Sequence, residues 1–151
     1  MNAEDIVIKY DSSIIVRRWA AVWIDFIALF GILLLAQVIL GDEIYRKTLA
    51  IWVGILIAYF PILEGLTGVT AGKFILRIKV VDSNCKSPGI GKAIIRTLLK
   101  IIEVNPFLLG GLPAGIIALF SKKKQRLGDM LAKTYVVKIK DIQNAALADN
   151  N

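Results

Sequence analysis

The chain of 151 residues contains no histidine and only one cysteine, Cys85. Without an imidazole ring, a common metal ligand and the most common catalytic base are both missing. A single cysteine cannot form an internal disulfide bond. The sequence also has no recognisable nucleophile, metal-ligand set or cofactor-binding loop. These absences predict that the protein is not an enzyme and that it uses no metal site or cofactor.

Acidic residues are also scarce, with 12 Asp and Glu against 19 Lys and Arg. Such an excess of positive charge suits nucleic acid, anionic lipid or the cytoplasmic loops of a membrane protein. The basic residues cluster beside apolar segments, and no interleaving of aromatic and basic residues typical of RNA binding is visible. We therefore expect a bilayer with anionic headgroups as a partner, and no nucleic acid.

Long apolar runs dominate the chain, which is 56% apolar with a mean hydropathy of +0.65. The first run, residues 19–40, covers about 33 Å as a helix, enough to cross the hydrocarbon core of a bilayer. A second run covers residues 45–65, and the formal charges of the short loop between the two runs cancel. The pattern predicts two transmembrane helices joined outside the cell, with the N terminus in the cytoplasm. The protein would be a multi-pass protein of the inner (cytoplasmic) membrane, with residues 1–151 as a single membrane domain.

Short strands are expected on the cytoplasmic side. The basic segment from Thr67 to Lys92 is predicted to be cytoplasmic, and apolar and basic residues alternate within it over residues 76–80. A similar alternation covers residues 135–140, and a weaker one covers residues 6–10. Two or three such strands would form a small sheet that ties the tail to the central loop.

The region of residues 92–120 is predicted to be embedded in the membrane without a full crossing. It begins as an amphipathic helix whose polar residues recur every three or four positions: Lys92, Arg96, Lys100 and Glu103. Residues 107–120 are apolar but cover only about 21 Å as a helix. The tail, residues 121–151, begins with a basic run that requires the cytoplasmic side. A re-entrant pair of helices that returns at Asn105-Pro106 or at the Gly110 to Gly115 break satisfies both conditions.

The predicted fold class is thus an all-α polytopic membrane protein with two full transmembrane helices, this embedded pair and a small basic cytoplasmic portion. The alternative is a plain third span with an external tail.

Three stretches of the chain carry a family resemblance. They read R-R-W-A-A-V-W-I-D from Arg17 to Asp25, E-G-L-T-G-V-T-A-G-K from Glu64 to Lys73, and K-K-Q-R-L-G-D-M-L-A-K-T-Y-V-V ending at Val137. The sequence closely resembles the RDD family of small prokaryotic membrane proteins over most of its length.

The resemblance has consequences for residues and for activity. The family is named for one arginine and two aspartates, which fall here on Arg18, Asp25 and Asp129. Members often have T-P-G-K where this chain has T-A-G-K at residues 70–73, a change expected to affect the rigidity of the turn more than its chemistry. The resemblance implies no established molecular function. Ligand transport is suspected for the family, and cation/proton antiport has been proposed for some members.

Asp25 lies inside the first predicted span, where an ionised carboxylate is costly unless a partner compensates its charge. Arg18 precedes it by seven residues, so the two share a helix face about 10 Å apart and cannot pair closely. The partner of Asp25 would be a basic residue such as Arg96 or Arg126, a proton, or a metal cation. Two hypotheses follow: a structural pair that locks helices together, or a carboxylate that exchanges a proton for a small cation.

Other charged residues near the predicted cytoplasmic surface are candidates for the same site. Glu64 would be a second carboxylate along one path, or simply an interfacial charge. Lys73 is expected to meet lipid phosphate. Asp129 either caps a short helix, with hydrogen bonds from Arg126 and Lys133, or closes a cytoplasmic mouth over Arg18 or Arg96.

Transport of a small ligand or cation, including cation/proton exchange by intramembrane carboxylates, is the function that these features predict. Two spans enclose little space, so a homo-oligomer is expected if the protein transports. The alternative is a non-catalytic membrane scaffold or assembly partner that binds anionic lipid and another membrane protein.

Overall fold

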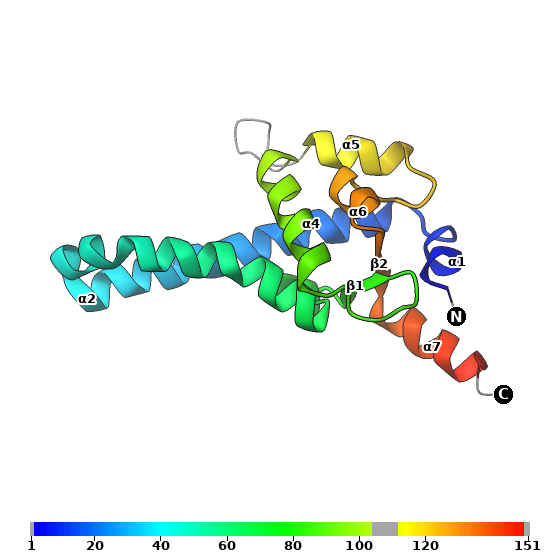
Figure 1. Ribbon diagram of the computed structural model, residues 1–151, viewed down its shortest axis with the longest axis horizontal. Coiled ribbons are helices and arrows are strands. Elements are labelled where there is room, and N and C mark those ends of the chain that lie inside the picture. The colour runs from blue at the N-terminus through cyan, green and yellow to red at the C-terminus, as the bar shows by residue number, and fades with distance from the viewer. Residues whose placement is uncertain (1, 104–111, 150–151) are drawn as a thin grey trace.

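The largest element is helix α2, Ser13–Thr67, in a computed structural model that describes residues 2–103 and 112–149. Its backbone leaves helical geometry at Gly41, with φ 75° and ψ 157°, a combination that residues with a side chain rarely adopt. Figure 1 shows the two legs of α2 lying side by side, with the turn at the far left. The predicted spans, residues 19–40 and 45–65, thus fall on the two legs of one helical hairpin.

Apolar side chains on both legs of the hairpin face outward. Phe30 is 61% exposed, Val38 81% and Ile57 57%. Among the described residues, α2 is the one helix long and apolar enough to cross a membrane, and only 11% of its most apolar window is buried. An apolar surface of this extent is not stable in water, so it needs lipid or protein around it.

The small sheet predicted from the two alternating segments is present and has two strands. Strand β1, Ile78–Asp82, pairs antiparallel with β2, Thr134–Lys138, and Val80 lies opposite Val136. The strands begin and end within two residues of their predicted positions. The sheet joins the central loop to the tail, as expected from the alternating pattern of both segments.

The strand predicted at residues 6–10 is wrong. The chain instead forms helix α1, Ala3–Val7, followed by a turn. Its N-cap Asn2 accepts a hydrogen bond from the backbone N–H of Glu4 at 3.3 Å, and acidic residues in the first turn suit the positive end of a helix. Local capping thus outweighed a weak alternation of apolar residues.

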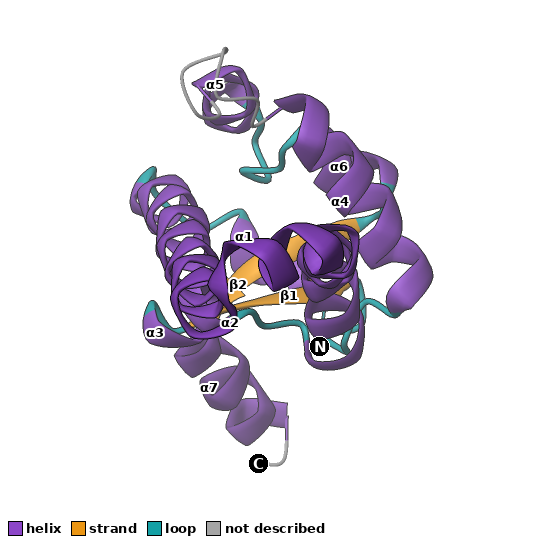
Figure 2. Ribbon diagram, turned by 90° about the vertical axis from the view of Figure 1, so that its left-hand side faces the viewer, coloured by secondary structure: helices purple, strands orange, loops and turns teal. Residues whose placement is uncertain are grey.

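The sheet packs between the base of the hairpin and α1. Ile78 and Val80 join a core cluster with Ile14 and Ile15 of α2, whereas Val81 joins a second cluster that includes α1. Helix α3, Ala71–Ile75, packs on α2, and helix α7, Ile139–Asp149, follows β2 at the C-terminal end. Figure 2 shows the strands beneath the hairpin when the molecule is viewed along α2.

Three further helices lie at the side of the hairpin base. Helix α4, Ile90–Glu103, packs on α2 and on helix α6, Leu127–Leu131, while helix α5, Leu112–Phe120, lies nearby. The amphipathic helix of residues 92–103 is therefore present as expected. The turn predicted at Asn105-Pro106 lies outside the described residues, as do the first two residues of the Gly110 to Gly115 break, whereas its remaining residues form the first turn of α5.

The orientation of α4 follows from the burial of its side chains. Arg96 and Thr97 are buried, while Ile94, Ile95 and Leu98 are 43 to 59% exposed. The charged face of the helix thus points into the molecule and the apolar face points outward. This is the opposite of a soluble amphipathic helix, and it suits a helix whose outer face meets lipid.

Candidate functional site

A network of buried charges lies where the hairpin meets α4 and α6, and it begins at Asp129. This carboxylate pairs with Arg18 of α2 and with Arg96 of α4, and all three residues are at most 6% exposed. Arg18 also donates a hydrogen bond to the backbone carbonyl of Lys124 at 2.7 Å, and Arg96 donates one to the hydroxyl of Thr134 at 2.6 Å. These contacts tie the first leg of the hairpin to the segment around α6.

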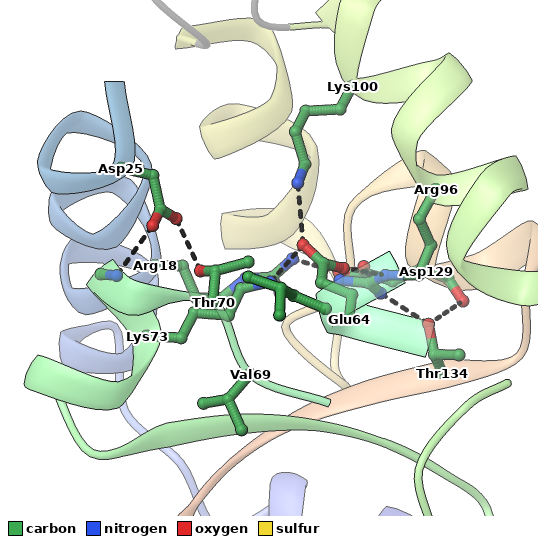
Figure 3. A network of polar contacts seen from close by, with 12 residues as sticks. Arg18, Asp25, Glu64, Val69, Thr70, Lys73, Arg96, Lys100, Asp129 and Thr134 are labelled. Carbon is green, nitrogen blue, oxygen red and sulfur yellow. Dashed lines mark hydrogen bonds and ion pairs between the residues drawn. The ribbon is translucent and has the colours of Figure 1, made fainter. Parts of the chain in front are cut away.

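Glu64, on the second leg, is the other carboxylate of the network and is fully buried. It accepts hydrogen bonds from Arg96 Nε at 3.1 Å and from Lys100 Nζ at 2.8 Å, and it pairs with Lys73. Three cations thus share one carboxylate. Arg96 contacts Glu64 and Asp129 at once, so a single guanidinium joins the two halves of the network (Figure 3).

Asp25 belongs to a separate arrangement. It accepts hydrogen bonds from Thr70 Oγ1 at 2.6 Å, Gly72 N at 2.8 Å and Tyr59 Oη at 3.0 Å. Tyr59 Oη in turn accepts one from the backbone N–H of Ala71 at 3.1 Å. Of the partners considered for Asp25, the basic residues Arg96 and Arg126 pair with other groups: the contacts of Asp25 are hydroxyl and backbone donors of the second leg and of the start of α3. A carboxylate with several such donors is well compensated without a cation.

The glycine of this segment makes the close approach possible. A Cβ atom on Gly72 would lie 2.1 Å from the backbone oxygen of Ala21, so only glycine lets α3 rest directly on the first leg. The sequence indicated a turn at residues 70–73, and the structure adds a close contact between the backbones of Gly72 and Ala21.

Lys73 does not reach lipid phosphate as predicted, because it is only 5% exposed and pairs with Glu64. Burial lowers the pKa of its amine to about 7, with the charges of Lys100 and Arg96 acting in the same direction and Glu64 opposing them. Lys73 is thus a buried amine that titrates near neutral pH.

Asp129 makes the contacts that both hypotheses require of it, with the start of α6 and with Arg18 and Arg96. Its carboxylate accepts a hydrogen bond from the backbone N–H of Arg126 at 3.1 Å at the start of α6, and it also binds Arg18 and Arg96. Burial acts to raise the pKa of Asp129, but the neighbouring guanidinium charges outweigh it and hold the pKa well below its usual range. Lys133, the other expected donor, is exposed.

A family model, that of the RDD family, matches residues 13–133. The chain belongs to the RDD family. This RDD-family protein is a membrane protein, in agreement with the apolar hairpin. Comparisons with curated proteins and with solved structures gave no match.

The arginine and two aspartates expected from the family name are all buried in this RDD-family protein. Arg18 and Asp129 form an ion pair, whereas Asp25 holds the start of α3. Within the part of the chain that the structure describes, no three Cys, Asp or Glu side chains gather as a metal site. The three residues thus lie in two separate arrangements, one around Asp129 and one around Asp25.

Sequence reasoning missed several members of the network. Thr70, Tyr59 and Thr134 carry no charge and gave no signal for their hydrogen bonds. Lys100 was placed on the polar face of an amphipathic helix, and no partner was assigned to it. Arg96 and Lys100 are four residues apart, so both lie on one face of the helix. This spacing could have indicated that one carboxylate, such as Glu64, contacts both cations.

Proposed function

We propose that this RDD-family protein is a multi-pass protein of the cell membrane that moves a small charged ligand across the bilayer. The observation that carries the proposal is the charge network at the base of the hairpin. Buried ion pairs are expensive to desolvate and add little net stability, so several at one place in a membrane protein indicate function.

The proposed orientation places the base of the hairpin in the cytoplasm. The central loop and the tail, which hold most of the basic residues, meet there in the sheet. Residues 13–40 and 42–67 form legs of about 40 Å each, longer than the hydrocarbon core. The positive-inside rule then puts both termini in the cytoplasm and Gly41 outside.

In this proposal the network acts as a lock at the cytoplasmic end of the hairpin. Arg96 connects Glu64 on one leg to Asp129, and Asp129 connects to Arg18 on the other leg. Separation of the legs requires that these pairs break, unless a ligand replaces one partner. A charged ligand that binds the network would therefore bias the hairpin between closed and open states.

Lys73 supplies a route for coupling to protons. With its pKa near 7, the amine gains or loses its proton under physiological conditions, and this changes the charge next to Glu64. The surrounding cations are Arg96 and Lys100, and Glu64 is the carboxylate that pairs with Lys73. Exchange of a ligand against protons is consistent with this position.

The ratio of cations to carboxylates in the network indicates whether the ligand is an anion or a cation. The network and its surroundings contain more cations than carboxylates, which favours an anion. Cation/proton exchange is the second candidate, and Lys73 favours it because loss of its proton relieves part of this excess. In either case a single hairpin offers little enclosure, so we propose a homo-oligomer in which hairpins line the path together.

A flux assay in proteoliposomes tests the proposal. We expect the protein to move at least one of sodium, potassium, lithium, chloride or phosphate, with a pH dependence near 7. Glu64→Gln leaves three cations without their shared carboxylate and should change the rate at least about tenfold. Glu43→Gln is the matched control, because Glu43 is also on α2 but 82% exposed on its side chain.

If the wild-type protein moves none of these ions and no protons, transport is refuted and the scaffold alternative gains. Equal effects of Glu64→Gln and Glu43→Gln would refute the role of the network as a lock.

A further inference from the structure

A small cavity lies beside the charge network, between α2, α4 and α6. Its volume is about 20 Å³, and it is partly open to the outside. It is lined by the following six residues: Arg18, Arg96, Lys100, Arg126, Gly128 and Asp129. Because these residues come from three elements far apart in the sequence, the cavity exists only in the folded molecule.

The lining is strongly cationic. Four of its six residues carry positive charge, and only one is a carboxylate. That carboxylate, Asp129, already accepts from Arg18, Arg96 and the backbone N–H of Arg126. Glu64 behind the cavity is likewise shared among three cations. The buried cations around the cavity therefore outnumber the carboxylates. At low solvent exposure, a cation attracts an anion much more strongly than it does in water.

We propose that this cavity binds a phosphate group. Guanidinium groups present planar pairs of N–H donors that match phosphate oxygens, and a lysine amine adds a point charge. The volume admits about one water-sized group, so the cavity would take the oxygens of a phosphate from its open side rather than enclose a larger solute.

The position of the cavity fits both a free phosphate and a phospholipid headgroup. Ile94 and Leu98 are exposed on the outer face of α4, and the amine of Lys100 on the same helix lies 4.2 Å from the centre of the Phe60 ring. Apolar groups next to a cationic opening are typical of the boundary between headgroups and acyl chains. The inference deepens the proposed function by naming the ligand chemistry at the lock.

Equilibrium binding separates the two sources. Full-length protein in neutral detergent is titrated with inorganic phosphate against chloride at equal ionic strength. The same protein in nanodiscs is compared between phosphatidylcholine alone and phosphatidylcholine with phosphatidylglycerol, with thermal stability as the readout. Stabilisation in the first arm assigns free phosphate, and stabilisation only in the second assigns a headgroup.

Matched variants locate the effect in the cavity. Lys100→Gln removes one lining charge while Lys73 and Arg96 still hold Glu64, and we expect it to weaken binding at least about tenfold. Lys100→Arg should restore binding. Lys122→Gln removes the same charge from an exposed position after α5 and should change binding less than about twofold.

The proposal is overturned if neither phosphate nor anionic lipid stabilises the wild type, or if Lys122→Gln weakens binding as much as Lys100→Gln. Binding without flux would refute transport alone, and flux without binding would refute this cavity alone.

Discussion

At the scale of single residues, Asp25 fixes the start of α3 against the hairpin. Its three hydrogen bonds join the first leg to Tyr59 on the second leg and to residues 70–72. We expect Asp25→Asn to lower the free energy of unfolding by about 1–3 kcal/mol, because charge-assisted hydrogen bonds are lost at a buried position. Thermal unfolding in detergent measures this effect. Asp42→Asn, at an exposed position on the same helix, is the control and should change little.

A different result would refute this structural role of Asp25. If Asp25→Asn were as stable as the wild type and yet lost pH-dependent flux, Asp25 would be the proton-exchanging carboxylate of the second hypothesis.

Asp129 should make stability depend on acidic pH. Its folded pKa lies below the value of 3.8 expected in the unfolded chain, so its stabilising effect is complete above about pH 4. As the pH falls further, the unfolded chain takes up the proton first, and the stabilisation is lost towards the folded pKa. Unfolding midpoints measured from pH 7 to pH 3 should therefore fall below about pH 4.

The variant Asp129→Asn checks the assignment. It leaves Arg18 and Arg96 without their shared carboxylate and should cost about 3–5 kcal/mol at neutral pH. Its midpoints should also fall less steeply below pH 4. Asp5→Asn, at an exposed position on α1, should follow the wild type, and a wild-type slope in Asp129→Asn would show that another group is responsible.

At the scale of elements, the contact between α3 and the first leg depends on Gly72. Gly72→Ala places a Cβ 2.1 Å from the backbone oxygen of Ala21, so α3 has to move away and its hydrogen bond to Asp25 is strained. We expect a loss of about 1–3 kcal/mol in thermal unfolding, as for other overpacked sites.

Gly54→Ala is the matched control within α2. Nothing lies within 4 Å of a Cβ built there, so alanine should be neutral or stabilise the helix by about 1 kcal/mol. Similar losses for the two variants would mean that α3 does not rest on the hairpin as described.

At the scale of the whole molecule, the hairpin and the sheet separate an apolar portion from a basic one. We propose that the basic portion lies in the cytoplasm, and cysteine labelling tests this. In intact cells, an impermeant thiol reagent should label a cysteine at Asp42 and should not label Cys85 or a cysteine at Leu147 in α7. The two introduced cysteines are made in a Cys85→Ser background.

Labelling at Leu147 from outside would overturn this orientation and support a third span with an external tail. Lysed cells provide the control that all three positions react when the reagent can reach them, since Asp42 and Leu147 are exposed and Cys85 is partly so.

The sequence by itself determined the local features of this protein. Apolar runs of sufficient length gave both legs of the hairpin, and alternation gave the two strands to within two residues, because hydropathy and side-chain periodicity are local properties. It also singled out Arg18, Asp25, Glu64 and Asp129 as candidate site residues, and Asp25 as a charge that needs compensation, since burial of a carboxylate is costly wherever it occurs.

Only the tertiary structure decided which partners compensate these charges. The cations of α4 face inward, Asp25 contacts hydroxyl and backbone donors, and Lys73 is buried against Glu64. Such pairings depend on how α2, α3, α4 and α6 pack, and residues distant in sequence meet only after packing. A pattern along one segment predicts which face is charged, but the neighbouring segment determines what that face meets.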